Sequence, residues 1–336
     1  MLTPGRGLRG ARILDLPRSG AHAWAVAGRF YTPSGEVDIG TGTPPEGPPE
    51  RRVFRVDGAT PRSQAEIAQR VAAVWLTPQM DRLFQDGLSG RRRFLDRLVF
   101  AVEPGHAREV AAYETAMANR NRLLAEERGD PVWLGGIEDS MARHAVAATA
   151  ARAGLVARLN AALAEGVAGA FPATRMTLVC PIAARLESEP ALAVEDWLRG
   201  TLASGRGRDA TAGSALHGAH RADMSLADVA SGQDAATAST GQQKALLIAV
   251  ILGHAAVLTA ARGFGPLLLL DEPAVHLDAE RRAALFAALA ALPAQAFLTG
   301  TDSDTFAPLA GVAAFWRSGG GGLAPDPDFP APAALH

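Results

Sequence analysis

The residues with the clearest chemical potential are two adjacent carboxylates that follow an apolar run. Four leucines at 267–270 lead directly into Asp271 and Glu272. A fully apolar run predicts a central strand of a parallel sheet covered on both faces, and function in such sheets gathers at the carboxyl ends of the strands. An aspartate there can hold Mg²⁺ beside a nucleotide, and the next glutamate can orient or deprotonate an attacking water. Plain α/β proteins also contain such strands, so the pair alone leaves both interpretations open.

Two further motifs flank this pair. Ser239 and Gly241 stand just ahead of an apolar stretch, 245–261, which is typical of a helix whose first N–H groups face an anion. Asp278 follows the acidic pair after a short turn. A helix cap and a simple turn are the structural alternatives. The order and spacing of the three motifs nevertheless resemble the signature motif, Walker B strand and D-loop of ABC ATPases.

A phosphate-binding loop has the pattern G-x-x-x-x-G-K-S/T, in which the lysine reaches the nucleotide phosphates. Lys244 is the only lysine and follows Gln243, so the printed sequence contains no such loop. We expect the reading frame upstream of Met1 to encode a strand, this loop and a helix, because the start is misplaced or the segment was lost. We also expect the chain as printed not to bind ATP, and to expose apolar sheet surface that favours aggregation.

The composition is that of a globular protein. The 336 residues are 48% hydrophobic and 20% charged, with a net charge of −2, so contact with nucleic acid must come from a local patch. The single cysteine, Cys180, excludes a disulfide or a cysteine-built zinc site within the chain. No uninterrupted run of about 18 apolar residues occurs, which favours a cytoplasmic protein without a membrane span.

The pattern of apolar residues predicts an α/β fold with a helical insertion. Short apolar runs at 25–26, 37–39, 53–56 and 71–76 predict strands. Two long stretches, 106–127 and 137–165, have helical periodicity and predict helices packed side by side. The tail from Gly319 is rich in glycine and proline, and we expect it to fray.

We therefore expect an ABC-ATPase-type head that lacks the strand and helix of its phosphate-binding loop, with an inserted, mainly helical second lobe. The predicted division is 1–88 for the first part of the head, 89–207 for the helical lobe and 208–336 for the second part of the head. A helical layer within one continuous domain is the alternative.

Several blocks are similar to those of the RecF family of bacterial recombination mediators. They are the opening segment 3–9, the T-P and R-R-x-F-L-D blocks at 75–78 and 91–96, the R-N-x-L-L helix at 119–124, and the H-R-x-D block at 217–223, where Ala219 replaces a usual proline. The order of these blocks agrees with the family over nearly the full chain. Their presence favours RecF over an SMC-like or transporter ATPase, since prolines in the middle region also interrupt any long coiled coil.

The resemblance assigns roles to single residues. It implies that Asp271 holds Mg²⁺ and that Glu272 acts on the attacking water. It also implies an ATP-dependent homodimer. The residues that would touch the nucleotide or cross the dimer interface are Ser239, Gly241, Gln242, Asp278 and Gln79. For Gln79, a solvated loop side chain is the alternative. No histidine stands at the switch position after the next strand, so Thr299 or Thr301 is the candidate sensor of the γ-phosphate.

The resemblance further implies binding to DNA at single-strand gaps or junctions, and cooperation with RecR and RecO in loading RecA during recombinational repair and the SOS response. Arginine suits phosphate oxygens. The candidate DNA contacts are Arg91, Arg92, Arg93, Arg120, Arg122, Arg206, Arg208, His220 and Arg221. Structural salt bridges and a buried histidine are the alternatives. A DNA-binding or scaffold protein that neither binds nor hydrolyses nucleotide is the alternative function.

Overall fold

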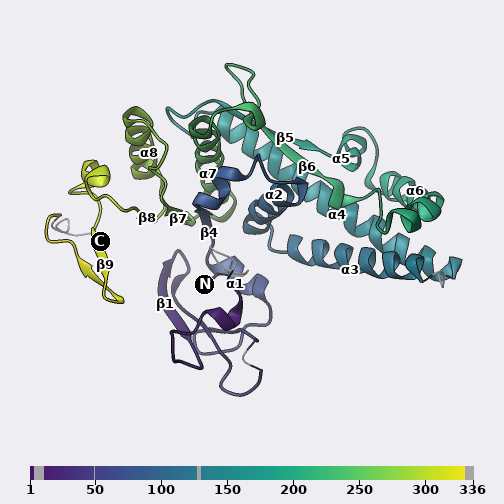
Figure 1. The fold of residues 1–336 in the computed structure, drawn as a ribbon, viewed down its shortest axis with the longest axis horizontal. Coiled ribbons are helices and arrows are strands. Elements are labelled where there is room, and N and C mark those ends of the chain that lie inside the picture. Colours follow the sequence, from purple (N-terminus) through teal and green to yellow (C-terminus); the bar gives the residue numbers. More distant parts are fainter. Residues whose placement is uncertain (4–10, 49, 127–129, 330–336) are drawn as a thin grey trace.

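A computed structural model describes residues 1–3, 11–48, 50–126 and 130–329 (Figure 1). The similarity noted for residues 3–9 therefore lies almost wholly outside the described residues. The α-helices are α1 (Gln64–Arg70), α2 (Leu88–Val102), α3 (His106–Ala125), α4 (Pro131–Ala164), α5 (Pro181–Leu186), α6 (Ala191–Ala212), α7 (Thr240–Arg262) and α8 (Ala279–Ala291). The strands are β1 (Ala25–Thr32), β2 (Gly35–Gly42), β3 (Val53–Val56), β4 (Ala73–Leu76), β5 (Thr174–Val179), β6 (Asp223–Asp228), β7 (Leu267–Asp271), β8 (Ala296–Thr299), β9 (Trp316–Gly319) and β10 (Gly322–Pro325).

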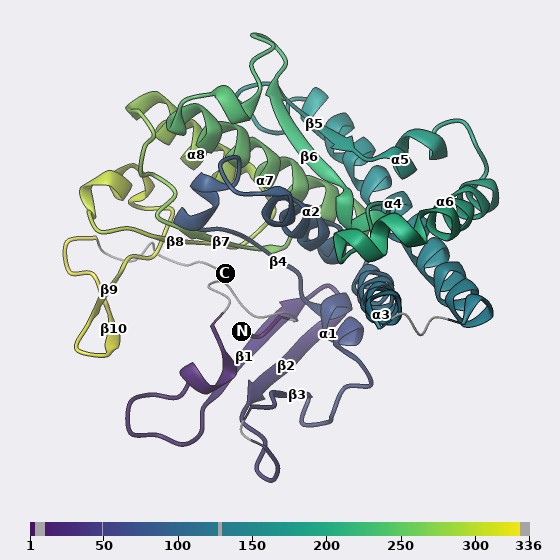
Figure 2. The same cartoon turned by 45° about the vertical axis from the view of Figure 1, so that its right-hand side comes forward.

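The main core forms around a parallel sheet of order β4-β7-β8. Leu268 and Leu270 of β7 are buried on one face, together with Val74 and Leu76 of β4. Helices α7 and α8 lie on one side of this sheet (Figure 2). The alternate residues of β7 are only half-buried. The prediction of a central strand is confirmed, but coverage of both faces is not found among the described residues.

The antiparallel sheet β1-β2-β3 and α1 form a smaller core of their own. Val37 and Ile39 of β2 are almost fully buried there, at 2% and 1% exposure, against Ile67 of α1. The predicted runs 25–26, 37–39 and 53–56 lie in these three strands, whereas the run 71–76 ends in β4 of the parallel sheet. Helix α1 was not predicted, although Ser63 caps it by accepting the N–H of Glu66.

The two predicted long helices are α3 and α4, which pack side by side and extend away from the sheet (Figure 1). Helix α4 begins at Pro131, earlier than predicted, because Asp130 caps it and proline suits the first turn. Its first half joins α3, α5 and α6 in a second core, while residues such as Leu155 and Leu159 reach the main core. A single helix therefore connects the two cores.

Three features differ from what the patterns predicted. Strand β5 lies within the middle region and pairs antiparallel with β6 from the returning chain. Helix α2 contributes Phe94, Leu95, Leu98 and Val99 to the main core rather than to the helical arm, which consists of α3, the first half of α4, α5 and α6. Strands β9 and β10 form a hairpin in the tail that was expected to fray. The division into lobes at 88 and 207 remains a prediction, and these contacts cross both boundaries.

Helix α7 is long and apolar enough to cross a membrane by length and composition alone. Of the most apolar 18-residue segment of this helix, however, 78% is buried inside the protein. Every residue from Gln243 to Ala255 is buried, including His254. A helix that is apolar all round and enclosed by other elements is typical of a core helix in a large domain.

His254 makes the stability of this core dependent on pH. Burial lowers the pKa of His254 to about 4, and its Nε2 lies 2.9 Å from the carbonyl oxygen of Leu98. The unfolded histidine titrates near 6.5, so the unfolded state binds more protons between pH 6.5 and pH 4. The free energy of unfolding is therefore expected to fall by about 3 kcal/mol as pH falls through this window. Urea denaturation at pH 7 and pH 4 measures this fall.

The matched variants are His254→Asn and His217→Asn, the second of which changes an exposed histidine. The buried substitution is expected to flatten the pH dependence, whereas the exposed one keeps it. An unchanged pH dependence in His254→Asn would assign the effect to other groups.

Candidate nucleotide site

The parallel register brings three strand ends to one edge of the sheet. Leu76 pairs with Leu270, and Asp271 pairs with Thr299. The hydroxyl of Thr299 donates to Oδ1 of Asp271 at 2.7 Å and accepts the backbone N–H of Glu272 at 3.2 Å. One hydroxyl from β8 therefore orients both residues of the acidic pair.

The backbone of Glu272 is in the left-handed region, with φ of 53°. His276 in the same loop has φ of 65°. Such a conformation in a residue other than glycine costs about 1–3 kcal/mol and persists where neighbours hold it, most often at functional sites. The carbonyl of Glu272 accepts a hydrogen bond from Nζ of Lys244 at 2.9 Å. The acidic pair thus lies at the start of a strained turn, residues 271–278, which we call the acidic turn. Side chains from β8 and α7 hold this turn in place.

The tip of α7 is closed by a capping box. The Ser239 hydroxyl accepts the N–H of Gln242 at 3.3 Å, and the Gln242 side chain accepts the N–H of Ser239 at 3.0 Å. The cap that sequence reasoning gave as the structural alternative is therefore present. A side chain at Gly241 would place its Cβ 3.1 Å from the carbonyl oxygen of His276. Only glycine fits without displacing this loop, so the α7 tip lies directly against the acidic turn.

Asp278 and Gln79 are both exposed beside these elements. Asp278 caps α8, since its Oδ1 accepts the N–H of Arg281 at 2.8 Å. Gln79 lies in a short 3₁₀ turn, Pro78–Arg82, that follows β4. The structure gathers the strand ends, the Gly241 side of the helix tip and the acidic turn. The nucleotide roles of Ser239, Gly241, Gln242, Asp278 and Gln79 remain predictions.

The donor set at Asp271 is compatible with magnesium. Mg²⁺ beside a nucleotide is usually held by one or two carboxylates together with phosphate oxygens and water. Asp271 is half-buried at the end of β7 and oriented by Thr299. Among the described residues no three His, Cys, Asp or Glu side chains gather to hold a metal. The remaining ligands would therefore come from the nucleotide and from water.

Two residues of this site were missed from the sequence. Lys244 is buried at the second turn of α7, and its Nζ lies 3.3 Å from Oδ2 of Asp81 as well as on the carbonyl of Glu272. The available signal was a lone lysine directly before the apolar stretch 245–261. Asp81 gave no signal of its own, because it lies 163 residues from its partner.

Two of the three predicted DNA-contact residues of α2, Arg91 and Arg92, have partners within the protein. Arg91 forms a bidentate ion pair with Asp223, in which Nε and Nη2 of the guanidinium lie 2.6 and 2.8 Å from the two carboxylate oxygens. Arg92 donates to the carbonyl of His220, and burial lowers the pKa of Arg92. Both side chains therefore connect α2 to the returning chain. Arg93 and Arg221 are exposed and stay as predicted DNA contacts.

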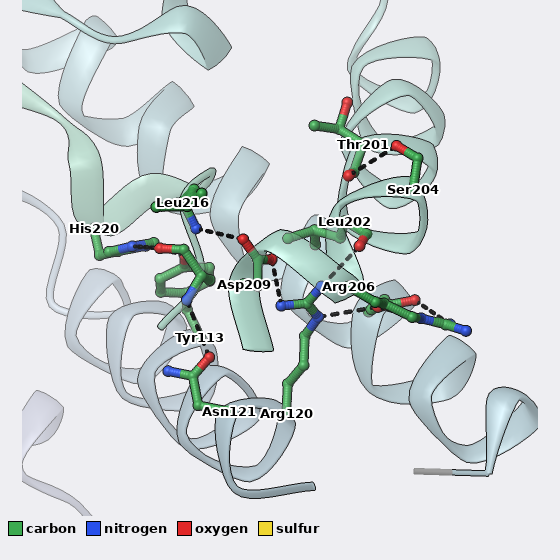
Figure 3. Close-up of polar contacts among 12 residues, drawn as sticks. Tyr113, Arg120, Asn121, Thr201, Leu202, Ser204, Arg206, Asp209, Leu216 and His220 are labelled. Carbon is green, nitrogen blue, oxygen red and sulfur yellow. Dashed lines mark hydrogen bonds and ion pairs between the residues drawn. The ribbon is translucent and has the colours of Figure 1, made fainter. Parts of the chain in front are cut away.

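His220 is held as a neutral ring in the 3₁₀ turn Ala219–Arg221, which contacts α3 through Tyr113. Its Nε2–H donates to the carbonyl of Ala215 at 2.8 Å, and its Nδ1 accepts the hydroxyl proton of Tyr113 at 2.6 Å (Figure 3). Burial lowers the pKa of His220, so the cationic form is disfavoured. With both ring nitrogens engaged, the structure favours the buried structural histidine over a phosphate contact.

The prediction that Arg120 contacts DNA is wrong. Its side chain is fully buried and binds Glu138, Asp209 and the carbonyl of Leu202 (Figure 3). Arg206 binds the same glutamate at 2.5 Å. A guanidinium enclosed in this way cannot reach a DNA backbone, so Arg120 is a structural residue of the arm.

No family model matches the chain. It is 46% identical over 332 residues to the DNA replication and repair protein RecF of Mesorhizobium japonicum, covering 98% of this chain and 87% of that protein. It is 44% identical to the RecF proteins of Agrobacterium fabrum and Brucella suis biovar 1, covering 96% of this chain in both cases and 86% and 84% of those proteins.

Two solved structures of the recombination mediator protein RecF share the fold. The ATP complex superposes with a TM-score of 0.81 at 20% identity, covering 96% of this chain and 85% of that one. The complex with the analogue ATPrS gives 0.77 at 22% identity, covering 90% and 81%. The identities and the coverage together show that the chain belongs to the RecF family of DNA replication and repair proteins.

Proposed function

We propose that this protein binds DNA at single-strand gaps or junctions in an ATP-dependent manner and, with RecR and RecO, helps to load RecA. The observation that carries the proposal is the acidic turn, in which Thr299 and Lys244 fix Glu272 beside the exposed tip of α7. Membership of the RecF family supports the repair role. A cytoplasmic location and a part in the SOS response belong to the same proposal.

In this proposal two copies of the protein enclose each nucleotide. Ser239, Gly241 and Gln242 of one copy meet the phosphates bound by the other, and Asp278 crosses the interface. Asp271 would hold Mg²⁺, whose positive charge offsets the negative charge of the phosphates. Glu272 accepts a proton from the attacking water or orients it. The exposed N-terminal end of α7 favours negative charge through its helix dipole.

Equilibrium dialysis with labelled ATP and Mg²⁺ tests the nucleotide half of the proposal. The sample is the complete gene product, which we define as the given chain together with the upstream segment expected to encode the G-x-x-x-x-G-K-S/T loop. Binding that is lost on chelation of Mg²⁺ is the expected result. No ATP binding, with DNA binding retained, would instead support the scaffold alternative.

The prediction for DNA binding concerns Arg93 and Arg221. They are exposed on α2 and on the 3₁₀ turn Ala219–Arg221, and Arg92 joins these two elements. Replacing both by alanine is expected to weaken binding to a gapped duplex and to reduce the slope of log K against log salt by about 2, because each phosphate contact contributes about 0.9. Fluorescence anisotropy across a salt series measures both quantities. Arg12→Ala, an exposed arginine near the amino-terminal end, is the control, and an equal effect there would contradict the assignment.

A further inference from the structure

Lys244 is unusual because it is both the only lysine and nearly inaccessible. Its side chain is 1% exposed on a helix whose neighbouring residues, Gln243 and 245–255, are also buried. A buried ammonium is strongly disfavoured unless charged or polar partners surround it. The partners of Lys244 therefore indicate its role in the fold.

Those partners come from two of the three loops around the candidate nucleotide site. Nζ lies 2.9 Å from the carbonyl oxygen of Glu272 and 3.3 Å from Oδ2 of Asp81. Asp81 belongs to the turn that holds Gln79, and Lys244 itself follows the helix tip of Ser239. One ammonium thus connects the Gln79 turn, the α7 tip and the acidic turn.

The contact with Glu272 bears on the direction of its side chain. The backbone N–H of Glu272 donates to the Thr299 hydroxyl, and its carbonyl receives the ammonium of Lys244. Both polar backbone groups are held by side chains from other elements while φ stays at 53°. A left-handed residue sends its side chain in a different direction from an extended one, so these two bonds set where the carboxylate points.

We propose that Lys244 is a positioning residue, which holds Glu272 in its left-handed conformation and links that conformation to the turn containing Gln79. This inference rests on the proposed ATPase function. The Asp81 contact couples the Gln79 turn to the ammonium of Lys244. A shift of this turn or of the α7 tip therefore moves the ammonium, and the ammonium moves the carbonyl of Glu272. Oδ1 of Asp81 is buried and has no hydrogen-bond partner among the described residues, so the Lys244 bond is the one that anchors this carboxylate.

The test measures ATP turnover and nucleotide affinity in the complete gene product. Lys244→Met combined with Asp81→Asn removes the donor to Glu272 without leaving an unpaired buried charge. This double variant is expected to lose about 10- to 100-fold in kcat, as a displaced catalytic group does, with nucleotide affinity within about twofold of the parent. Asp81→Asn alone keeps the lysine on the carbonyl and is expected to stay within about threefold.

Two further measurements separate positioning from a general loss of structure. Lys244→Arg keeps a cationic donor and is expected to retain kcat within about fivefold. Adding the Lys244→Met, Asp81→Asn pair to Glu272→Gln is expected to produce no further loss of single-turnover rate, because both changes act through one carboxylate.

The inference is overturned if the double variant turns over ATP at the parental rate, if Asp81→Asn alone loses as much, or if Lys244→Arg fails as completely as the methionine. Additive losses with Glu272→Gln would also contradict it. An unaltered parent that binds no ATP, or binds ATP without turning it over, would defeat the proposed function instead, so the two failures are distinguishable.

Discussion

Arg120→Met is expected to lower the free energy of unfolding by about 3–5 kcal/mol. The guanidinium lies 3.0 Å from Glu138 and 2.7 Å from Asp209, and both carboxylates are at most 3% exposed. Methionine would leave Asp209 buried without its cation, and Glu138 with Arg206 alone. Because the three residues join α3, α4 and α6, the loss should appear as early unfolding of the helical arm. Urea denaturation followed by circular dichroism measures it.

Arg122→Met is the matched control on the same helix. Arg122 is exposed and has a weak contact of 3.4 Å with Asn119, so the change is expected to stay within about 0.5 kcal/mol. Equal stability of the two variants would show that the buried network contributes nothing net to the fold.

Glu272→Gln is expected to lower the rate of ATP hydrolysis by about 10²- to 10⁴-fold in the complete gene product. The amide cannot accept a proton from water, whereas the backbone bonds of residue 272 to Thr299 and Lys244 do not involve the side chain. Nucleotide binding should therefore survive. Single-turnover hydrolysis and nucleotide binding, measured on the same preparation, separate the two effects.

Glu280→Gln provides the comparison for this rate. Glu280 is an exposed acid in the first turn of α8, just beyond the acidic turn, and its removal is expected to leave hydrolysis unchanged. A Glu272→Gln protein that hydrolyses ATP at the parental rate would remove Glu272 from the chemistry.

Much of the candidate site could be predicted because its signals are local. The leucine run ending in Asp271 predicts β7, which lies at the centre of its sheet. The apolar stretch 245–261 predicts most of α7, which begins earlier, at Thr240, with Ser239 as its cap. Parallel register then follows from the α/β class and brings Asp271 to Thr299. Thr299 is a candidate sensor of the γ-phosphate from the sequence, and its two hydrogen bonds give it an orienting role toward the acidic pair.

The parts that were missed depend on contacts between distant segments. Arg120 looked like an available cation, yet its partner Asp209 is 89 residues away and no pattern joins the two. The same holds for Lys244 and Asp81, and for the pairing of β5 with β6. An arginine in a helix has the same local sequence whether it faces solvent or a buried carboxylate, so only the fold decides between DNA contact and internal ion pair.

The most direct measurement of the central claim is the mass in solution of the complete gene product carrying Glu272→Gln, determined by sedimentation with and without ATP and Mg²⁺. The account predicts a monomer without nucleotide and a dimer with it, and it predicts that Ser239→Arg at the exposed α7 tip abolishes the dimer while each copy still binds ATP. A protein that binds ATP yet keeps one mass in every condition would contradict a nucleotide enclosed between two copies.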